Sequence, residues 1–153
     1  MGTLPPHGRI AAVDYGTVRI GVAVSDPERR IASPLASLSR GSSQSDSRWF
    51  AELVAREEIV GFVVGLPVGS AGGETQKSRE ARQFGQWLGQ STGLPVAYFD
   101  ERYTTVEAEA ILSGAELTSK RRKKRRDMLA AQILLTAFLE SATPGEAPGA
   151  LDD

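Results

Sequence analysis

Residues Ile10–Ser25 read IAAVDYGTVRIGVAVS, and this stretch decides the expected fold. Two apolar runs, Ile10–Val13 and Ile20–Val24, flank a short polar link that contains a glycine, which is the pattern of a β-hairpin. Asp14 follows the first run and shares a strand face with Ala12, because side chains two residues apart point the same way. An ionisable group therefore stands where the pattern expects a core residue, and a carboxylate there needs a partner.

Two glycines define the surroundings of Asp14. Gly16 allows a tight turn, and Gly21 leaves the second strand without a side chain, so that a bulky ligand could approach the backbone beside Asp14. The alternative interpretation is that Asp14 only caps the turn. Further carboxylates along the chain favour a functional role for it.

The rest of the chain predicts strands linked by helices. A hairpin extended by a third strand and by helix-linked parallel strands gives an α/β fold, with a mixed five-stranded sheet and helices on its faces. We expect a flexible leader over residues 1–8, one domain over residues 9–140 and a disordered tail over residues 141–153. The expected elements after the hairpin are a strand over Arg30–Leu38, a loop over Gly41–Ser47, a helix over Arg48–Glu58 capped by Ser45 or Asp46, a strand over Ile59–Leu66, a helix over Glu74–Gln90, a strand over Leu94–Phe99, a helix from Thr104 to Leu112, a linker over Ser113–Ser119 and a helix over Asp127–Glu140.

The composition excludes several kinds of site. The chain of 153 residues has no cysteine, which excludes disulfides, thiolate zinc sites and a cysteine nucleophile, and fits a reducing compartment. Its one histidine, His7, lies in the expected leader, so a Ser-His-Asp site is not expected. No stretch approaches the roughly 20 apolar residues that span a bilayer, so we expect a soluble, cytoplasmic protein without membrane contact.

Positive charge is concentrated in one run, although the formal net charge of the chain is −1. A run of this kind is often a solvated segment. It could instead bind the phosphates of a nucleic acid, with an affinity that falls steeply with salt. The seven consecutive basic residues are Lys120, Arg121, Arg122, Lys123, Lys124, Arg125 and Arg126.

The last predicted helix carries an acid on its apolar stripe. At 100° per residue, Asp127 lies in line with Ala131 and Leu134, so its side chain would point toward the sheet. An acid favoured by the helix dipole, or paired with a nearby arginine, would also explain this position. The functional interpretation is that Asp127 meets Asp14 and Glu101 beyond the carboxyl ends of the strands.

Three converging carboxylates would repel one another unless cations lie between them. Oxygen ligands select hard metal ions, chiefly Mg²⁺ or Mn²⁺. Two such ions about 4 Å apart would support an in-line displacement at phosphorus by an activated water. Because the basic run directly precedes Asp127, the combination indicates cleavage of a nucleic acid rather than of a small phosphate ester.

Four motifs, taken in order, resemble the YqgF family, also called RuvX-like. They are DYGTVRIGVAVSD from Asp14 to Asp26, VGLP from Val64 to Pro67, DERYTT from Asp100 to Thr105, and the basic run that leads to Asp127 and the pair Ala130–Ala131. The resemblance covers about residues 9–139. The loop after Pro67 lacks an acid that the family often has there.

The resemblance implies an RNase H-like fold, related to RuvC-type Holliday-junction resolvases. It implies a hydrolase of the two-metal-ion type that matures the 5′ end of pre-16S rRNA in ribosome biogenesis. By position, the catalytic and metal-binding acids of the family are Asp14, Glu101 and Asp127. Asp100 would point to the other side of the strand end and is expected either to support the metal-binding acids without binding the metal or to be structural.

Two arginines match the family's motifs. Arg19 would contact substrate phosphate or orient Asp14, and Arg102 would contact phosphate or pair with Asp127. A surface ion pair is the alternative for each. The expected partner is structured RNA, with branched DNA and the ribosome as further candidates, and the chain is expected to be a monomer or a weak homodimer.

Other function classes stay open at this point. An Asp-x-Gly-Thr hairpin also begins actin-like and sugar-kinase ATPases, but those proteins need two such lobes and this chain holds one. A Holliday-junction resolvase would use the same acids and basic run. A non-catalytic RNA-binding factor of ribosome assembly would keep the run without cleaving its ligand.

Overall fold

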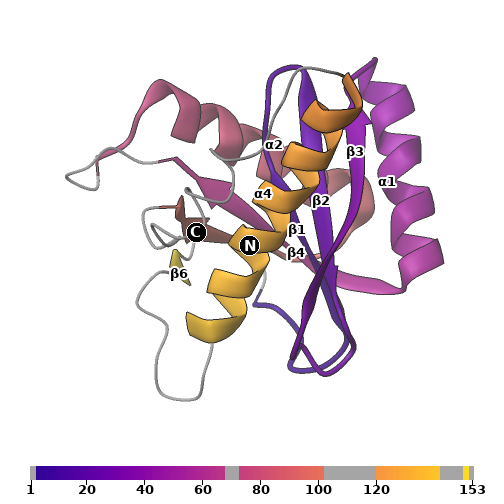
Figure 1. The fold of residues 1–153 in the computed structure, drawn as a ribbon, viewed down its shortest axis with the longest axis vertical. Helices are drawn as coiled ribbons and strands as arrows, with labels where there is room; N and C mark the ends of the chain where they lie inside the picture. Colours follow the sequence, from indigo (N-terminus) through magenta and orange to yellow (C-terminus); the bar gives the residue numbers. More distant parts are fainter. Residues whose placement is uncertain (1–2, 68–72, 102–119, 142–149, 152–153) are drawn as a thin grey trace.

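The computed structural model describes residues 3–67, 73–101, 120–141 and 150–151. Its strands form one sheet in the order β3-β2-β1-β4-β5-β6 (Figure 1). β1 (Arg9–Asp14) pairs antiparallel with β2 (Arg19–Ser25), which pairs antiparallel with β3 (Ala32–Ser39). The predicted hairpin and third strand are confirmed.

The other half of the sheet begins with parallel strands. β4 (Ile59–Leu66) pairs with β1, and β5 (Val96–Asp100) pairs with β4. The predicted bounds of β4 are correct, because an unbroken apolar run suits a strand that is covered on both faces. β6 (Ala150–Leu151) pairs antiparallel with β5, so the sheet has six strands rather than five, and two residues of the expected disordered tail form a strand.

Two helices on one face of the sheet begin where side chains cap them. α1 (Ser43–Glu57) starts after Ser42, whose hydroxyl accepts a hydrogen bond from the Ser45 amide, so the predicted loop to Ser47 and the predicted caps are wrong. α2 (Gln76–Thr92) starts after Thr75, which forms a reciprocal capping box with Ser78. Serine at the third helical position fills the role usually taken by Glu or Gln.

α4 (Lys120–Ser141) lies on the opposite face and crosses in front of the sheet in Figure 1. It contains the whole basic run, so the prediction that the helix begins at Asp127 is wrong. Lysine and arginine are good helix formers, and the run extends the apolar helix toward its N-terminus. The seven basic residues therefore lie on a regular helix beside the sheet.

Two apolar layers separate these helices from the sheet. The layer under α1 and α2 contains Phe50 and Phe84. The layer under α4 contains Ile10 and Ala12 of β1 with Ala131 and Leu134 of α4, and residues of α4 that were expected to face the sheet are buried there. Asp14, two residues after Ala12, therefore faces α4, as the alternation of β1 predicts.

The expected flexible leader is held against the domain. The Leu4 side chain packs over Gly61, where a Cβ would lie 2.6 Å from Leu4 Cδ2. The Gly8 amide donates to the Pro27 carbonyl at 3.1 Å, and its carbonyl accepts from Arg29 Nε at 2.8 Å. His7 is exposed.

Several predictions lie outside the described residues. They concern Arg102, the helix from Thr104 to Leu112, the linker Ser113–Ser119 and most of the tail. Among the helices that the structure describes, none combines the length and apolar character needed to cross a membrane.

Candidate active site

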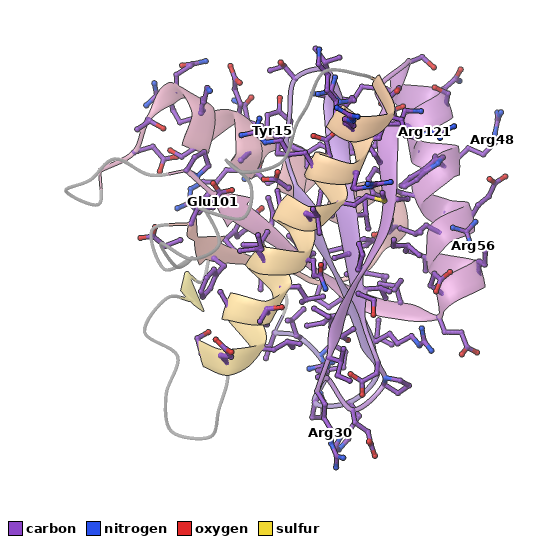
Figure 2. All side chains as sticks on the ribbon, viewed as in Figure 1. Tyr15, Arg30, Arg48, Arg56, Glu101 and Arg121 are labelled. Atoms are coloured by element: carbon purple, nitrogen blue, oxygen red, sulfur yellow. The ribbon has the colours of Figure 1, made fainter. Side chains whose placement is uncertain are left out.

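The Asp14 and Glu101 side chains meet where the parallel strands end. Asp14 is the last residue of β1, and Glu101 directly follows β5, on the far side of β4. Gly65 in β4 makes room for Glu101, since a Cβ there would lie 2.5 Å from Glu101 Oε2. The two carboxyl groups share a hydrogen bond. Figure 2 shows Glu101 in the half of the molecule that holds Tyr15, with Arg30 at the opposite end.

Burial and neighbouring charges raise the pKa values of both carboxyl groups in this pair. Burial raises the pKa of Asp14 to about 7, and the negative charges of Glu101 and Asp127 contribute to the rise, while Arg126 opposes it. Burial also raises the pKa of Glu101, and the charge of Asp100 adds to that shift. This pair of hydrogen-bonded carboxyl groups therefore binds a proton at a higher pH than isolated carboxyl groups do. A divalent cation could take the place of that proton.

Asp127 reaches the same region from α4. A Cβ at Gly21 would collide with the backbone carbonyl of Asp127, so the bare position in β2 accommodates the helix rather than a ligand, contrary to the expectation. This close approach sets how closely α4 packs on β2. Gly21 lies opposite Asp14 in the register of the hairpin. The predicted direction of Asp127 toward the sheet is confirmed.

Two hydrogen bonds hold the Asp127 carboxylate. Arg19 Nε donates to Asp127 Oδ2 at 2.7 Å, and Ser37 Oγ donates to the same oxygen at 3.1 Å. Of the alternatives for Arg19, the structure therefore shows an ion pair, and the partner is Asp127 rather than Asp14. The pair is partly buried, because about a quarter of each side chain is exposed: 29% for Arg19 and 20% for Asp127.

The carboxylate oxygens of the site suit a hard divalent cation, but the three predicted acids do not all lie in direct contact. Asp14 and Glu101 supply carboxylate oxygens in direct contact, which fits Mg²⁺ or Mn²⁺. Over the described ranges, no group of three or more His, Cys, Asp or Glu side chains is close enough to hold a metal ion. Asp127 is near enough to raise the pKa of Asp14, yet its carboxylate is bound to Arg19 and Ser37. The structure therefore brings together two of the three predicted ligands, with the third beside them.

The basic run lies at the end of α4 that is nearest the acids. Arg121, Arg122 and Lys123 are exposed, as are Arg125 and Arg126, and Lys124 is half-buried. Arg126 is close enough to Asp14 to lower its pKa. Lys120 begins the helix, and Arg102 lies outside the described residues. The exposed cations could thus contact a phosphate backbone beside the acids.

Asp100 is buried, with 3% of its surface exposed, and it interacts with other groups, which agrees with a structural role.

Sequence reasoning missed three contributors to the site. Gly65 interrupts an apolar run, and that interruption is a signal of close approach. Lys77 of α2 acts against the raised pKa of Glu101, and Ser37 holds Asp127. Neither Lys77 nor Ser37 stands in a pattern that would single it out.

Two solved structures with a similar architecture are resolvases. RuvC of T. thermophilus, in complex with a Holliday junction substrate, aligns with a TM-score of 0.52 at 13% identity over 95% of this chain and 100% of that chain. The fowlpox virus resolvase, in complex with Holliday junction DNA, aligns with a TM-score of 0.54 at 12% identity over 88% of this chain and 99% of that chain. This likeness shows the RNase H-like fold. The fold, with Asp14 and Glu101 at the ends of its parallel strands, places the chain in the RNase H-like class of proteins.

The sequence places the chain more closely. Residues 8–141 match the RuvX family, described as Holliday junction resolvase, and the chain belongs to this family. A relative from Rhodopirellula baltica, named "Putative pre-16S rRNA nuclease", is 49% identical over 90% of this chain and 79% of its own length. A relative from Koribacter versatilis with the same name is 42% identical over 88% of each chain. The resemblance to the YqgF family is confirmed, and the chain is a nuclease, a hydrolase of phosphodiester bonds that binds nucleic acid.

Proposed function

We propose that this nuclease depends on a divalent metal ion and trims the 5′ end of pre-16S rRNA. The observation that carries the metal dependence is the hydrogen-bonded pair Asp14–Glu101, whose burial raises both pKa values and thereby favours a cation that neutralises the two carboxylates. The names of the relatives support the substrate. The site offers no histidine or cysteine to serve as a base or nucleophile, because the chain has no cysteine and His7 lies before β1.

Three acids share the catalytic work in this proposal. Asp14 and Glu101 would hold Mg²⁺ or Mn²⁺, and Asp127 would complete the ligand set. Such metal ions, expected to be two, would supply an activated water and stabilise the charge on the phosphoryl oxygens. Arg19 orients Asp127 through the 2.7 Å hydrogen bond to Oδ2 and thereby controls where its other carboxylate oxygen points.

The cations of the basic run hold the substrate in this proposal. Arg121 to Arg126 contact the phosphate backbone, and Lys120 and Arg102 are proposed to do the same. Such contacts position a strand without reading its sequence. Selection of the cleavage position would then depend on the structure of the RNA. Acting on this precursor would bring the enzyme to the assembling ribosome in the cytoplasm, as a monomer or a weak homodimer.

Resolution of Holliday junctions is the second candidate. The description of the family and the fold shared with RuvC favour it. Cutting two strands symmetrically would need two copies of the site. Because both reactions use the same chemistry, a comparison of substrates separates these candidates more directly than substitution of the acids does.

The test compares cleavage of an RNA that carries the 16S 5′ leader with cleavage of a four-way DNA junction, in Mg²⁺ or Mn²⁺. The proteins are wild type, Asp14→Asn, Glu101→Gln and the matched control Glu52→Gln, which changes an exposed acid of α1. We expect specific cleavage of the leader RNA by wild type and by the control, and its loss in both site variants. Preferential symmetric cutting of the junction would favour resolution. Salt-sensitive RNA binding without cleavage of either substrate would identify a non-catalytic factor.

A further inference from the structure

A second concave site lies on the sheet face that α1 and α2 cover. It is a hollow of about 300 Å³ between the end of β1, the segment joining β3 to α1, and α2. Three aromatic rings line it, from Tyr15, Phe84 and Trp87. Arg40 and two acids, Asp46 and Glu80, also line the hollow.

We propose that this hollow binds one unpaired nucleobase of the RNA substrate, next to the cleaved phosphodiester bond. The proposal rests on the proposed action on RNA and extends it, because it assigns a base-binding role to residues outside the acids and the basic run. The ligand is a flat, neutral heterocycle turned out of its helix.

The half-buried rings of Tyr15 and Trp87 and the exposed Arg40 side chain form a surface on which a base can stack. The Phe84 ring, with only 6% of its surface exposed, packs against both rings. The Tyr15 and Phe84 ring centroids are 5.3 Å apart, and those of Phe84 and Trp87 are 5.5 Å apart. The Arg40 guanidinium carbon lies 5.1 Å from the Tyr15 ring centroid and 5.9 Å from that of Phe84. Single-stranded nucleic acids are held by stacking on aromatic rings and on arginine planes of this kind.

The acids in the hollow favour a base over a phosphate. Asp46 is buried, with 6% of its surface exposed, and its Oδ1 accepts a hydrogen bond from the Gly41 amide at 3.0 Å. Glu80 is half-buried and accepts a hydrogen bond from Gln76 at 3.1 Å. Two carboxylates would repel a phosphate, whereas their oxygens can accept from the N–H groups on the edge of a base.

The hollow and the active site lie on opposite faces of the sheet, on either side of the link between β1 and β2. Tyr15 follows Asp14 directly, so the two side chains leave the backbone toward opposite faces. Arg40 Nη1 donates to the Gly16 carbonyl at 3.1 Å and to the Tyr15 hydroxyl at 3.2 Å, and the Arg40 amide donates to the Val18 carbonyl at 2.9 Å. A strand whose phosphate lies at Asp14 could therefore insert a neighbouring base beside Tyr15, provided that this base is unpaired.

The test measures binding without cleavage, in EDTA, so that a failed nuclease assay does not decide it. The ligands are a labelled single-stranded RNA from the leader, the same RNA paired with its complement, and a set in which one nucleotide at a time is abasic. The proteins are wild type, Arg40→Gln and the matched control Arg48→Gln, which removes an exposed charge from the outer side of α1 (Figure 2). Fluorescence anisotropy gives each dissociation constant.

We expect one abasic position to weaken binding to wild type by about 5- to 20-fold, in the range of one stacked base. Arg40→Gln should weaken binding of the intact strand similarly and make binding insensitive to that abasic position, while Arg48→Gln keeps the sensitivity. If Arg40→Gln and Arg48→Gln lose equal affinity for the RNA and no abasic position weakens binding to wild type, Arg40 acts only as a surface charge, and the proposal is overturned. The proposal would also be overturned if wild type bound the duplex tightly and Arg40→Gln weakened binding of the duplex as much as binding of the single strand.

Tryptophan fluorescence gives a readout that does not depend on Arg40. The chain has two tryptophans, so Trp49→Phe leaves Trp87 in the hollow as the only one, and Trp87→Phe leaves Trp49. We expect the single-stranded RNA to quench the emission of Trp49→Phe and to leave that of Trp87→Phe unchanged. Absence of quenching in Trp49→Phe at saturating RNA would contradict a base in the hollow. Equal quenching by a free nucleoside monophosphate at the same concentration would indicate a mononucleotide site instead.

Discussion

The side chain of Arg19 in β2 binds the carboxylate of Asp127 in α4, with 2.7 Å between Arg19 Nε and Asp127 Oδ2. The contact joins residues 108 positions apart, and Ser37 of β3 donates to the same oxygen. The third acid of the site is therefore held by the antiparallel half of the sheet, whereas Asp14 and Glu101 are held by the ends of parallel strands.

Loss of this contact should lower activity more than stability. We expect Arg19→Ala to reduce the cleavage rate about 10- to 100-fold, as is typical when the partner that orients a metal-binding side chain is removed. The free energy of unfolding should fall by only about 1 kcal/mol, because the pair is partly exposed. Single-turnover cleavage and urea denaturation measure the two effects. An Arg48→Ala control should change neither, and a full rate in Arg19→Ala would remove Arg19 from the site.

The packing of α4 on Gly21 makes a second prediction. A methyl group at Gly21 would collide with the Asp127 backbone, so Gly21→Ala should shift the helix and destabilise the protein by about 1–3 kcal/mol. Cleavage should fall as well, since the displaced helix carries Asp127. The control is Gly89→Ala in α2, where the nearest atom to an added Cβ is at an ordinary 3.4 Å. That variant should be neutral or slightly more stable, and equal losses in the two variants would argue against the close approach.

Much of the fold follows from local patterns in the sequence. The apolar runs of the hairpin and of Ile59–Leu66 predict β1, β2 and β4, because alternation and burial on both faces leave a direct mark on the residue types. The stripe that includes Asp127 and Ala131 predicts the face that α4 turns to the sheet. The start of α4 was missed, since a run of like charges resembles a solvated linker until the helix that continues it is known.

The contacts within the site were less predictable. Arg19 has the right charge to bind Asp14 or Asp127, and only the crossing of α4 over β2 and β3 decides for Asp127. Ser37 is an ordinary strand serine in the sequence. The hollow at Arg40 depends on the meeting of three elements, which no single stretch of sequence encodes. The roles assigned to the three acids and to the basic run stay predictions, which the experiments on cleavage and binding address.

The raised pKa of Asp14 predicts how pH affects the stability of the metal-free protein. Its pKa is about 7 in the folded chain against the ordinary 3.8, so between these values the folded chain binds more protons than the unfolded chain. The contribution of Asp14 to the free energy of unfolding therefore falls as pH rises from about 4 to about 7, and stays constant above that. Asparagine lacks this dependence. In EDTA, Asp14→Asn should gain up to about 4 kcal/mol over wild type between pH 4 and pH 8, because one unit of pKa shift is worth about 1.4 kcal/mol. A constant difference in urea midpoints would contradict the shift.

The exposed cations of α4 should set the salt dependence of RNA binding. Each phosphate contact to a single strand contributes about 0.7 to the slope of the logarithm of affinity against the logarithm of salt concentration. We expect the double variant Arg121→Gln and Arg125→Gln to lower the slope by about 1.4. The matched double variant Arg48→Gln and Arg56→Gln removes two exposed charges from α1 and should leave the slope unchanged. Equal slopes in all proteins would show that the basic run does not contact the strand.

Metal binding should displace the proton held between Asp14 and Glu101. Because the pKa of Asp14 is about 7, the affinity for Mn²⁺ should fall by up to about 10-fold for each pH unit below 7 and should level off above it. The number of protons released per ion should approach one at pH 6 and decline toward pH 8. Calorimetry in two buffers of different ionisation enthalpy measures that number. Asp14→Asn should bind the ion weakly and release no proton, whereas Glu52→Gln should behave as wild type. An affinity that does not change between pH 6 and pH 8 would mean that the ion binds elsewhere, because a cation at this pair must compete with the shared proton.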